Sequence, residues 1–181
     1  MKTKRRNMNN DIQEHLKNLK TLESEGGINK NPDTKVRSEI EIEDLLAHLI
    51  GVIDALLARI NKKLNLGIAE DMVCLTTVKK KLERLDLMKD LIDLDDDKCS
   101  WYWKLKDFRN IGTHRKIINV NESVGLFENA NTGKGSSGVT RFYITDSDTD
   151  LELIPYLEDR IQKMQVLIQR IISKEPLLKT P

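Results

Sequence analysis

The feature that most constrains the fold is a long amphipathic stretch over residues 38–66. Apolar side chains recur there at every third or fourth position, namely Ile42, Leu45, Leu46, Leu49, Ile50, Ile53, Leu56, Leu57, Ile60 and Leu64. This spacing predicts a helix of about seven turns whose apolar face must be buried against other helices. Ser38 and Glu41 have the spacing of a capping box at its start, and Gly67 suits its end.

Four other stretches have apolar residues at helical spacing, and they predict helices over 11–24, 70–92, 97–113 and 153–174. In the second of these helices, the inward positions are expected at Val73, Val78, Leu82, Leu85, Met88, Leu91 and Ile92. The run of aspartates at 95–97 is predicted to cap the third helix, because acidic groups stabilise a helix start.

Residues 117–149 have a different pattern, which is typical of β-structure. The strand-like segments are 117–120, 124–127 and 139–144. They predict a β-hairpin inserted before the last helix. The predicted fold is therefore all-α, an up-and-down bundle of four to five helices with a small β-hairpin insertion. We expect residues 1–36 to form a basic arm, a short helix and a linker, and residues 37–175 to form the bundle.

Composition excludes several classes of protein. Apolar residues make up 39% and charged residues 33%, and no apolar run approaches the ~18 residues that span a bilayer, so we expect no membrane partner. The basic start at residues 1–7 leads into no apolar stretch, so we expect it not to be a secretory signal. Thirty basic and 29 acidic residues leave a net charge of +1, which permits a local basic patch but excludes a bulk polycation.

The sequence contains parts of zinc, dinucleotide and calcium motifs, and each motif is incomplete. Cys74 and Cys99 form no CxxC pair, so no zinc site is expected, and a reducing, cytoplasmic setting is the simplest interpretation. Residues 133–138 match G-x-G-x-x-G without the preceding strand and following helix of a dinucleotide fold. Aspartates alternate at 93–97 and 146–150 without the glycine and glutamate of a calcium loop. We therefore expect no metal and no cofactor.

Four of the eight aromatic residues lie between positions 101 and 108, in the predicted helix 97–113. At about 100° per residue, the side chains of this helix fall into three stripes. The expected core stripe is Trp101, Leu105, Phe108 and Gly112. The two polar stripes are Tyr102, Lys106, Arg109 and Thr113, and beside them Trp103, Asp107, Asn110 and His114. A guanidinium, an amide and an imidazole thus share one exposed side of the helix.

Asn110 and His114 are four residues apart, which makes them neighbours on a helix surface. Arg109 and His114 are five residues apart, which corresponds to about 140° of rotation and roughly 7.5 Å of rise. In a straight helix these two side chains do not point at the same atom. Three arrangements would bring them together: a distortion near Gly112, a curled Arg109 side chain, or a second copy of the helix across a two-fold axis.

Arg109 and Asn110, followed by three residues and His114 near the end of a late bundle helix, resemble the HEPN superfamily (higher eukaryotes and prokaryotes nucleotide-binding). One toxin group of that superfamily also has Tyr two positions after the His, where this chain has Lys116. The resemblance implies a metal-independent endoribonuclease of the toxin–antitoxin or phage-defence type. Its expected partners are RNA, a second copy of the chain and an antitoxin protein.

The resemblance assigns catalysis to Arg109, Asn110 and His114. RNA supplies its own nucleophile, the 2′-hydroxyl, so His114 would shuttle a proton, Arg109 would clamp phosphate oxygens, and Asn110 would orient either group. The residues expected to bind substrate are Lys106, Arg115 and Lys116 for phosphate, and Tyr102 or Trp103 for stacking on a base.

Two other interpretations stay open on the residues alone. Cations at the end of a helix complement its macrodipole, so Arg109, His114, Arg115 and Lys116 can instead be structural. In that case the chain is a helical protein whose aromatic cluster is a partner-binding interface. Alternatively, it is a non-catalytic RNA- or nucleotide-binding bundle, in which Lys106, Arg115 and Lys116 matter more than His114.

Overall fold

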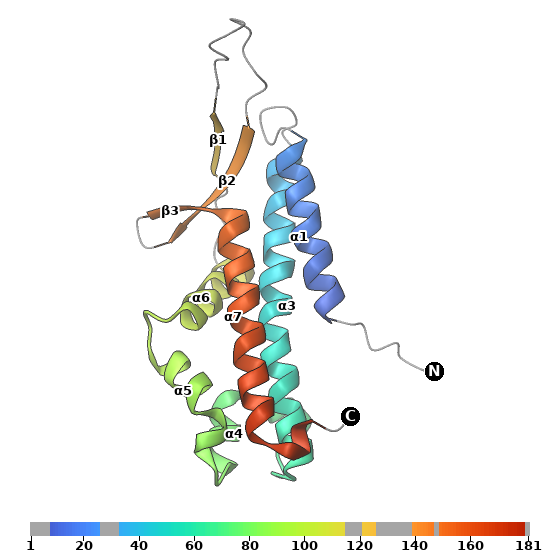
Figure 1. The fold of residues 1–181 in the computed structure, drawn as a ribbon, viewed down its shortest axis with the longest axis vertical. Helices are drawn as coiled ribbons and strands as arrows, with labels where there is room; N and C mark the ends of the chain where they lie inside the picture. Colours follow the sequence, from blue (N-terminus) through green and yellow to red (C-terminus); the bar gives the residue numbers. More distant parts are fainter. Residues whose placement is uncertain (1–7, 26–32, 115–120, 126–138, 147–148, 180–181) are drawn as a thin grey trace, which may run out of the picture. The chain divides into compact units, whose positions relative to one another are not determined.

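The computed structural model describes residues 8–25, 33–114, 121–125, 139–146 and 149–179. Its α-helices are α1 (Met8–Ser24), α3 (Asp33–Lys63), α4 (Leu75–Lys81), α5 (Lys89–Asp96), α6 (Trp101–His114) and α7 (Leu153–Lys174) (Figure 1). The 3-10 turns are η1 (Glu70–Met72), η2 (Leu85–Met88) and η3 (Pro176–Leu178), and the strands are β1 (Asn121–Gly125), β2 (Val139–Asp146) and β3 (Thr149–Glu152). The predicted all-α fold class is confirmed.

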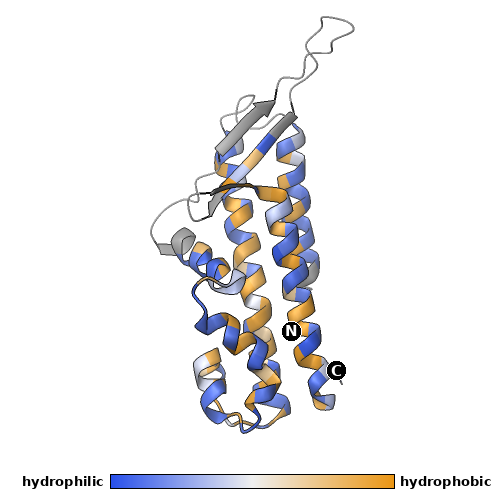
Figure 2. Ribbon diagram, turned by 60° about the vertical axis from the view of Figure 1, so that its left-hand side comes forward, coloured by the Kyte–Doolittle hydropathy of each residue, from blue (hydrophilic) through white to orange (hydrophobic). Residues whose placement is uncertain are grey.

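The chain divides into two compact units. The first consists of residues 1–45 and 110–159, and the second of residues 46–109 and 160–181. The helices α3, α6 and α7 contribute residues to both units. Apolar and polar residues are interspersed along the long helices (Figure 2), and no helix in the described ranges is long and apolar enough to cross a membrane.

Helix α1 contributes an apolar face to the first unit, as its spacing predicts. Its inward residues Ile12, Leu16, Leu19 and Leu22 are all buried. Its polar side chains contact Glu41 of α3. One oxygen of the Glu41 carboxylate accepts a hydrogen bond from Asn18 at 3.0 Å, and the other lies 2.7 Å from Nδ1 of His15.

Helix α3 is the predicted long amphipathic helix, and its apolar positions from Ile42 to Ile60 are buried. It begins at Asp33, however, and the predicted capping box is wrong. Ser38 lies inside the helix, where its buried hydroxyl donates to the carbonyl of Thr34 at 2.8 Å. After the helix ends, Gly67 has a φ of 68°, a left-handed conformation that glycine adopts without strain.

The continuous helix predicted over 70–92 is wrong, because the chain forms η1, α4, η2 and α5 there instead. Leu82 ends α4 in an extended conformation, with φ −81° and ψ 117°. The break changes the phase of the apolar positions, so that Leu85, expected inward, is 45% exposed, whereas Leu87 is buried. The start of α4 is fixed by Cys74, whose backbone N–H donates to the Thr77 hydroxyl at 3.0 Å.

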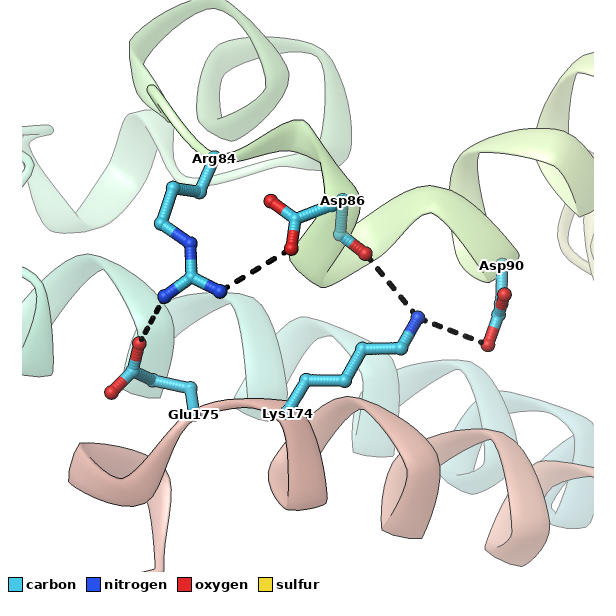
Figure 3. A network of polar contacts seen from close by, with 5 residues as sticks. All are labelled: Arg84, Asp86, Asp90, Lys174 and Glu175. Atoms are coloured by element: carbon cyan, nitrogen blue, oxygen red, sulfur yellow. Dashed lines mark hydrogen bonds and ion pairs between the residues drawn. The ribbon is translucent and has the colours of Figure 1, made fainter.

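A network of charged groups links η2 and α5 to the C-terminal end of α7 within the second unit (Figure 3). Lys174 Nζ donates to the backbone carbonyl of Asp86 at 3.2 Å and lies 3.4 Å from the Asp90 carboxylate. Arg84 contacts the carboxylates of Asp86 and Glu175, at 3.3 and 3.4 Å. Most of these groups are exposed, so each ion pair contributes only about 0–1 kcal/mol to stability.

The β insertion is a three-stranded antiparallel sheet of order β1-β2-β3, one strand more than the predicted hairpin. Glu122 lies opposite Phe142, and Leu151 lies opposite Ile144. Phe142 and Ile144 are buried, because alternate residues of a strand share one face. The sequence does not predict β3, since Thr149–Glu152 is too short and too polar to show alternation.

Two of the three predicted strand segments lie in or overlap observed strands. Segment 139–144 is confirmed as part of β2, and segment 124–127 overlaps the end of β1. Segment 117–120 lies outside the described residues. Helix α7 begins at Leu153, as predicted.

Candidate functional site

Helix α6 contains the predicted site residues from Tyr102 to His114, and Ser100 fixes where this helix begins. The Ser100 hydroxyl accepts the backbone N–H of Trp103 at 3.0 Å, which is the geometry of an N-cap. Asp97 lies in the preceding loop, where its carboxylate accepts the N–H of Cys99 at 2.9 Å. The predicted aspartate cap is therefore wrong, because the acidic side chain is used before the helix starts.

The buried side of α6 is rotated from the predicted core stripe. Tyr102 and Leu105 are 4% and 0% exposed, whereas Trp101 and Phe108 are only half-buried. The rings of Trp101 and Tyr102 meet edge to face, with 5.9 Å between centroids. At about 100° per residue, the half-buried Arg109 extends from the same side of the helix as Tyr102 and Leu105. The predicted place of Tyr102 on a polar stripe is thus wrong.

The buried Tyr102 lies among charged groups of the second unit. Burial raises the pKa of its phenol above the ordinary range, the negative charges of Asp95 and Asp54 raise it further, and Arg109 opposes them. The phenol therefore keeps its proton at neutral pH. Because the ring is buried, it does not offer a face to a stacked base. Trp103, the other predicted stacking residue, is half-buried.

Lys106 is held in place next to Tyr102. Its ammonium group makes an ion pair with Asp95 and lies 5.6 Å from the centroid of the Tyr102 ring. The Lys106 side chain is 35% exposed, and that of Asp95 is 25% exposed. Sequence reasoning missed Asp95, because it lies on α5 and Lys106 lies 11 positions later on α6, so the pair depends on how two separate helices pack.

The remaining motif residues follow along α6. Asn110 is exposed. The helix runs without interruption through Gly112 to His114, so a distortion at Gly112 does not bring the arginine and histidine together. The other two arrangements, a curled Arg109 side chain and a second copy of the helix, stay open. Outside the described residues lie the His114 side chain, Arg115 and Lys116.

Among the residues that the structure describes, no group of three or more His, Cys, Asp or Glu side chains could hold a metal ion. Cys74 and Cys99 are both exposed thiols. The glycine-rich segment 133–138 lies outside the described residues.

Comparison with known proteins identifies the family of this chain. The family model described as Cthe2314-like HEPN matches residues 29–173, a range that includes α6 and the sheet but not α1. No curated protein and no solved structure matches the chain. The motif of Arg109, Asn110 and His114 lies inside the matched range, on a helix of an all-α fold. Because the match extends over most of its length, the chain belongs to the Cthe2314-like HEPN family.

Proposed function

We propose that this protein is a metal-independent endoribonuclease of the toxin–antitoxin or phage-defence type, which cleaves RNA with Arg109, Asn110 and His114. The observation that carries the proposal is the presence of these three residues on α6, inside the range that matches the HEPN family. Membership of the family supports a coarser conclusion, a nucleotide-binding or ribonuclease type of function. The three motif residues support the finer part of the proposal, which is that the protein cleaves RNA.

The reaction needs a base, an acid and a cation. His114 removes the proton of a ribose 2′-hydroxyl, whose oxygen attacks the adjacent phosphorus. The P–O5′ bond breaks, a proton is returned to the leaving oxygen, and the products are a 2′,3′-cyclic phosphate and a 5′-hydroxyl. Arg109 stabilises the negative charge that grows on the phosphate oxygens. Asn110 orients the imidazole or the phosphate.

The surroundings of Arg109 favour this role. Arg109 is half-buried, and its charge acts on the buried Tyr102. A cation that is partly shielded from water attracts a phosphate more strongly than one at an open surface. Lys106 lies one turn before Arg109, and supplies a second cation for the RNA backbone. Arg115 and Lys116 follow His114 directly and extend the basic sequence.

The proposal is tested with purified protein and a labelled, mixed-sequence RNA in EDTA. We expect cleavage that leaves 2′,3′-cyclic phosphate ends, and a loss of about 100-fold or more in Arg109→Ala and in His114→Ala. Arg84→Ala is the matched control, because it removes an exposed arginine that belongs to the network of Figure 3, and it should cleave like the wild type. Circular dichroism checks that each variant is folded.

Three outcomes would contradict the proposal. Cleavage that persists in His114→Ala would exclude His114 as the group that transfers the proton. Cleavage that stops in EDTA would indicate metal-dependent chemistry. RNA binding without cleavage by any variant would instead favour a non-catalytic RNA- or nucleotide-binding bundle.

A further inference from the structure

The ion pair between Asp95 and Lys106 has no part in the chemistry above, and it places a carboxylate where an RNA phosphate would bind. We propose that Asp95 competes with the RNA backbone for Lys106. Its carboxylate pairs with the Lys106 ammonium group until an RNA phosphate replaces it, and this competition lowers the affinity for RNA. This inference rests on the proposed function, because it concerns the regulation of the same site.

The geometry of Lys106 supports such an exchange. Its ammonium group has two kinds of contact, the Asp95 carboxylate and the face of the Tyr102 ring, whose centroid is 5.6 Å away. A phosphate oxygen can replace a carboxylate oxygen as the acceptor, since both are anionic oxygens that pair with an ammonium group. The ring contact does not depend on the carboxylate, so the lysine stays oriented when the acceptor changes.

The exposure of the pair makes the exchange feasible. Lys106 and Asp95 are 35% and 25% exposed, so water and a phosphate can both approach them from outside. A fully buried pair would be too costly to separate, whereas a partly exposed pair contributes little to stability. The competitor therefore weakens RNA binding by a small factor without closing the site.

The charges around Tyr102 point the same way. Asp95 and Asp54 both raise the pKa of the Tyr102 phenol, and Arg109 lowers it, so all three charges act on one place in the second unit. With Lys106, this cluster holds two cations and two anions. RNA thus meets a cluster whose charges are balanced, and the substitution Asp95→Asn removes one of its two anions.

The test measures the affinity of a fluorescent RNA by anisotropy, in a His114→Ala background that prevents cleavage. Asp95→Asn should tighten binding about two- to fivefold and steepen the dependence of log K on log salt by roughly 0.7. In Asp95→Asn/Lys106→Gln this gain should disappear. The matched control is Asp96→Asn, which removes the same charge from the same helix and breaks a different lysine pair, to Lys79 at 3.1 Å.

A second measurement needs no RNA. The rate at which an amine-reactive reagent modifies Lys106, followed by mass spectrometry, should rise in Asp95→Asn and stay unchanged in Asp96→Asn. An unchanged rate in Asp95→Asn would overturn the proposal that the Asp95 carboxylate blocks the Lys106 ammonium group. Unchanged or weaker RNA binding by Asp95→Asn, or a gain that persists without Lys106, would overturn the competition while leaving the ribonuclease proposal intact. RNA binding by none of the variants would overturn both proposals.

Discussion

At the scale of one residue, the burial of Tyr102 makes the stability of the fold depend on pH. The pKa of its phenol is raised in the folded chain above the unfolded value of about 10. Below that pH the phenol is protonated in both states, and above it the unfolded chain loses the proton first. Stability is therefore lost as the pH rises above about 10, by up to about 1.4 kcal/mol per pH unit. We predict that Tyr102→Phe loses less unfolding free energy than the wild type between about pH 9 and about pH 11. Urea denaturation at both pH values measures this, and equal losses would contradict it.

At the scale of an element, Glu23 joins α1 to the sheet. Its carboxylate accepts the backbone N–H of Phe142 at 2.9 Å and lies 3.4 Å from the guanidinium of Arg141, both on β2. Glu23→Ala leaves the N–H of a buried residue without its acceptor, which should cost about 1–3 kcal/mol of unfolding free energy. Glu23→Gln keeps an oxygen for the N–H and should cost less. Glu14→Ala, on the exposed side of α1, is the control and should stay within about 0.5 kcal/mol in urea denaturation. Equal costs for Glu23→Ala and Glu14→Ala would show that the contact does not stabilise the docking of α1.

The elements also show what the sequence can and cannot predict. The apolar face of α3 is predictable, because the same spacing repeats over many turns and chance does not imitate it. Its start is not, because Ser38 bonds to Thr34 and Glu41 bonds to side chains of α1. The break at Leu82 is not predictable, because the apolar spacing continues through it and no glycine or proline lies in residues 70–92. The motif on α6 is visible in the sequence, because its residues lie on one helix. The Asp95–Lys106 pair is not visible, because it joins two helices.

At the scale of the whole molecule, the proposed reaction requires Arg109 and His114 to act on the same phosphate. The helix α6 is uninterrupted, and five residues of α-helix rotate the two side chains by about 140°. Arg109 extends from the side on which Tyr102 and Leu105 are buried, so curling round the helix would take its guanidinium away from those neighbours. A partner copy needs no such rearrangement, because a two-fold axis can bring Arg109 of one copy opposite His114 of the other. We therefore expect the active form to be a homodimer in which each site combines both copies.

Mixing two inactive variants tests this expectation. When Arg109→Ala and His114→Ala protomers are unfolded, mixed in equal amounts and refolded, random pairing makes half of the dimers mixed. A site that combines two copies is then intact once in every mixed dimer, so about a quarter of the wild-type cleavage should return. Each variant refolded alone is the control and should stay inactive. If every site is instead built within one copy, all sites in the mixture carry a lesion, and no cleavage should return even though the light-scattering mass is that of a dimer.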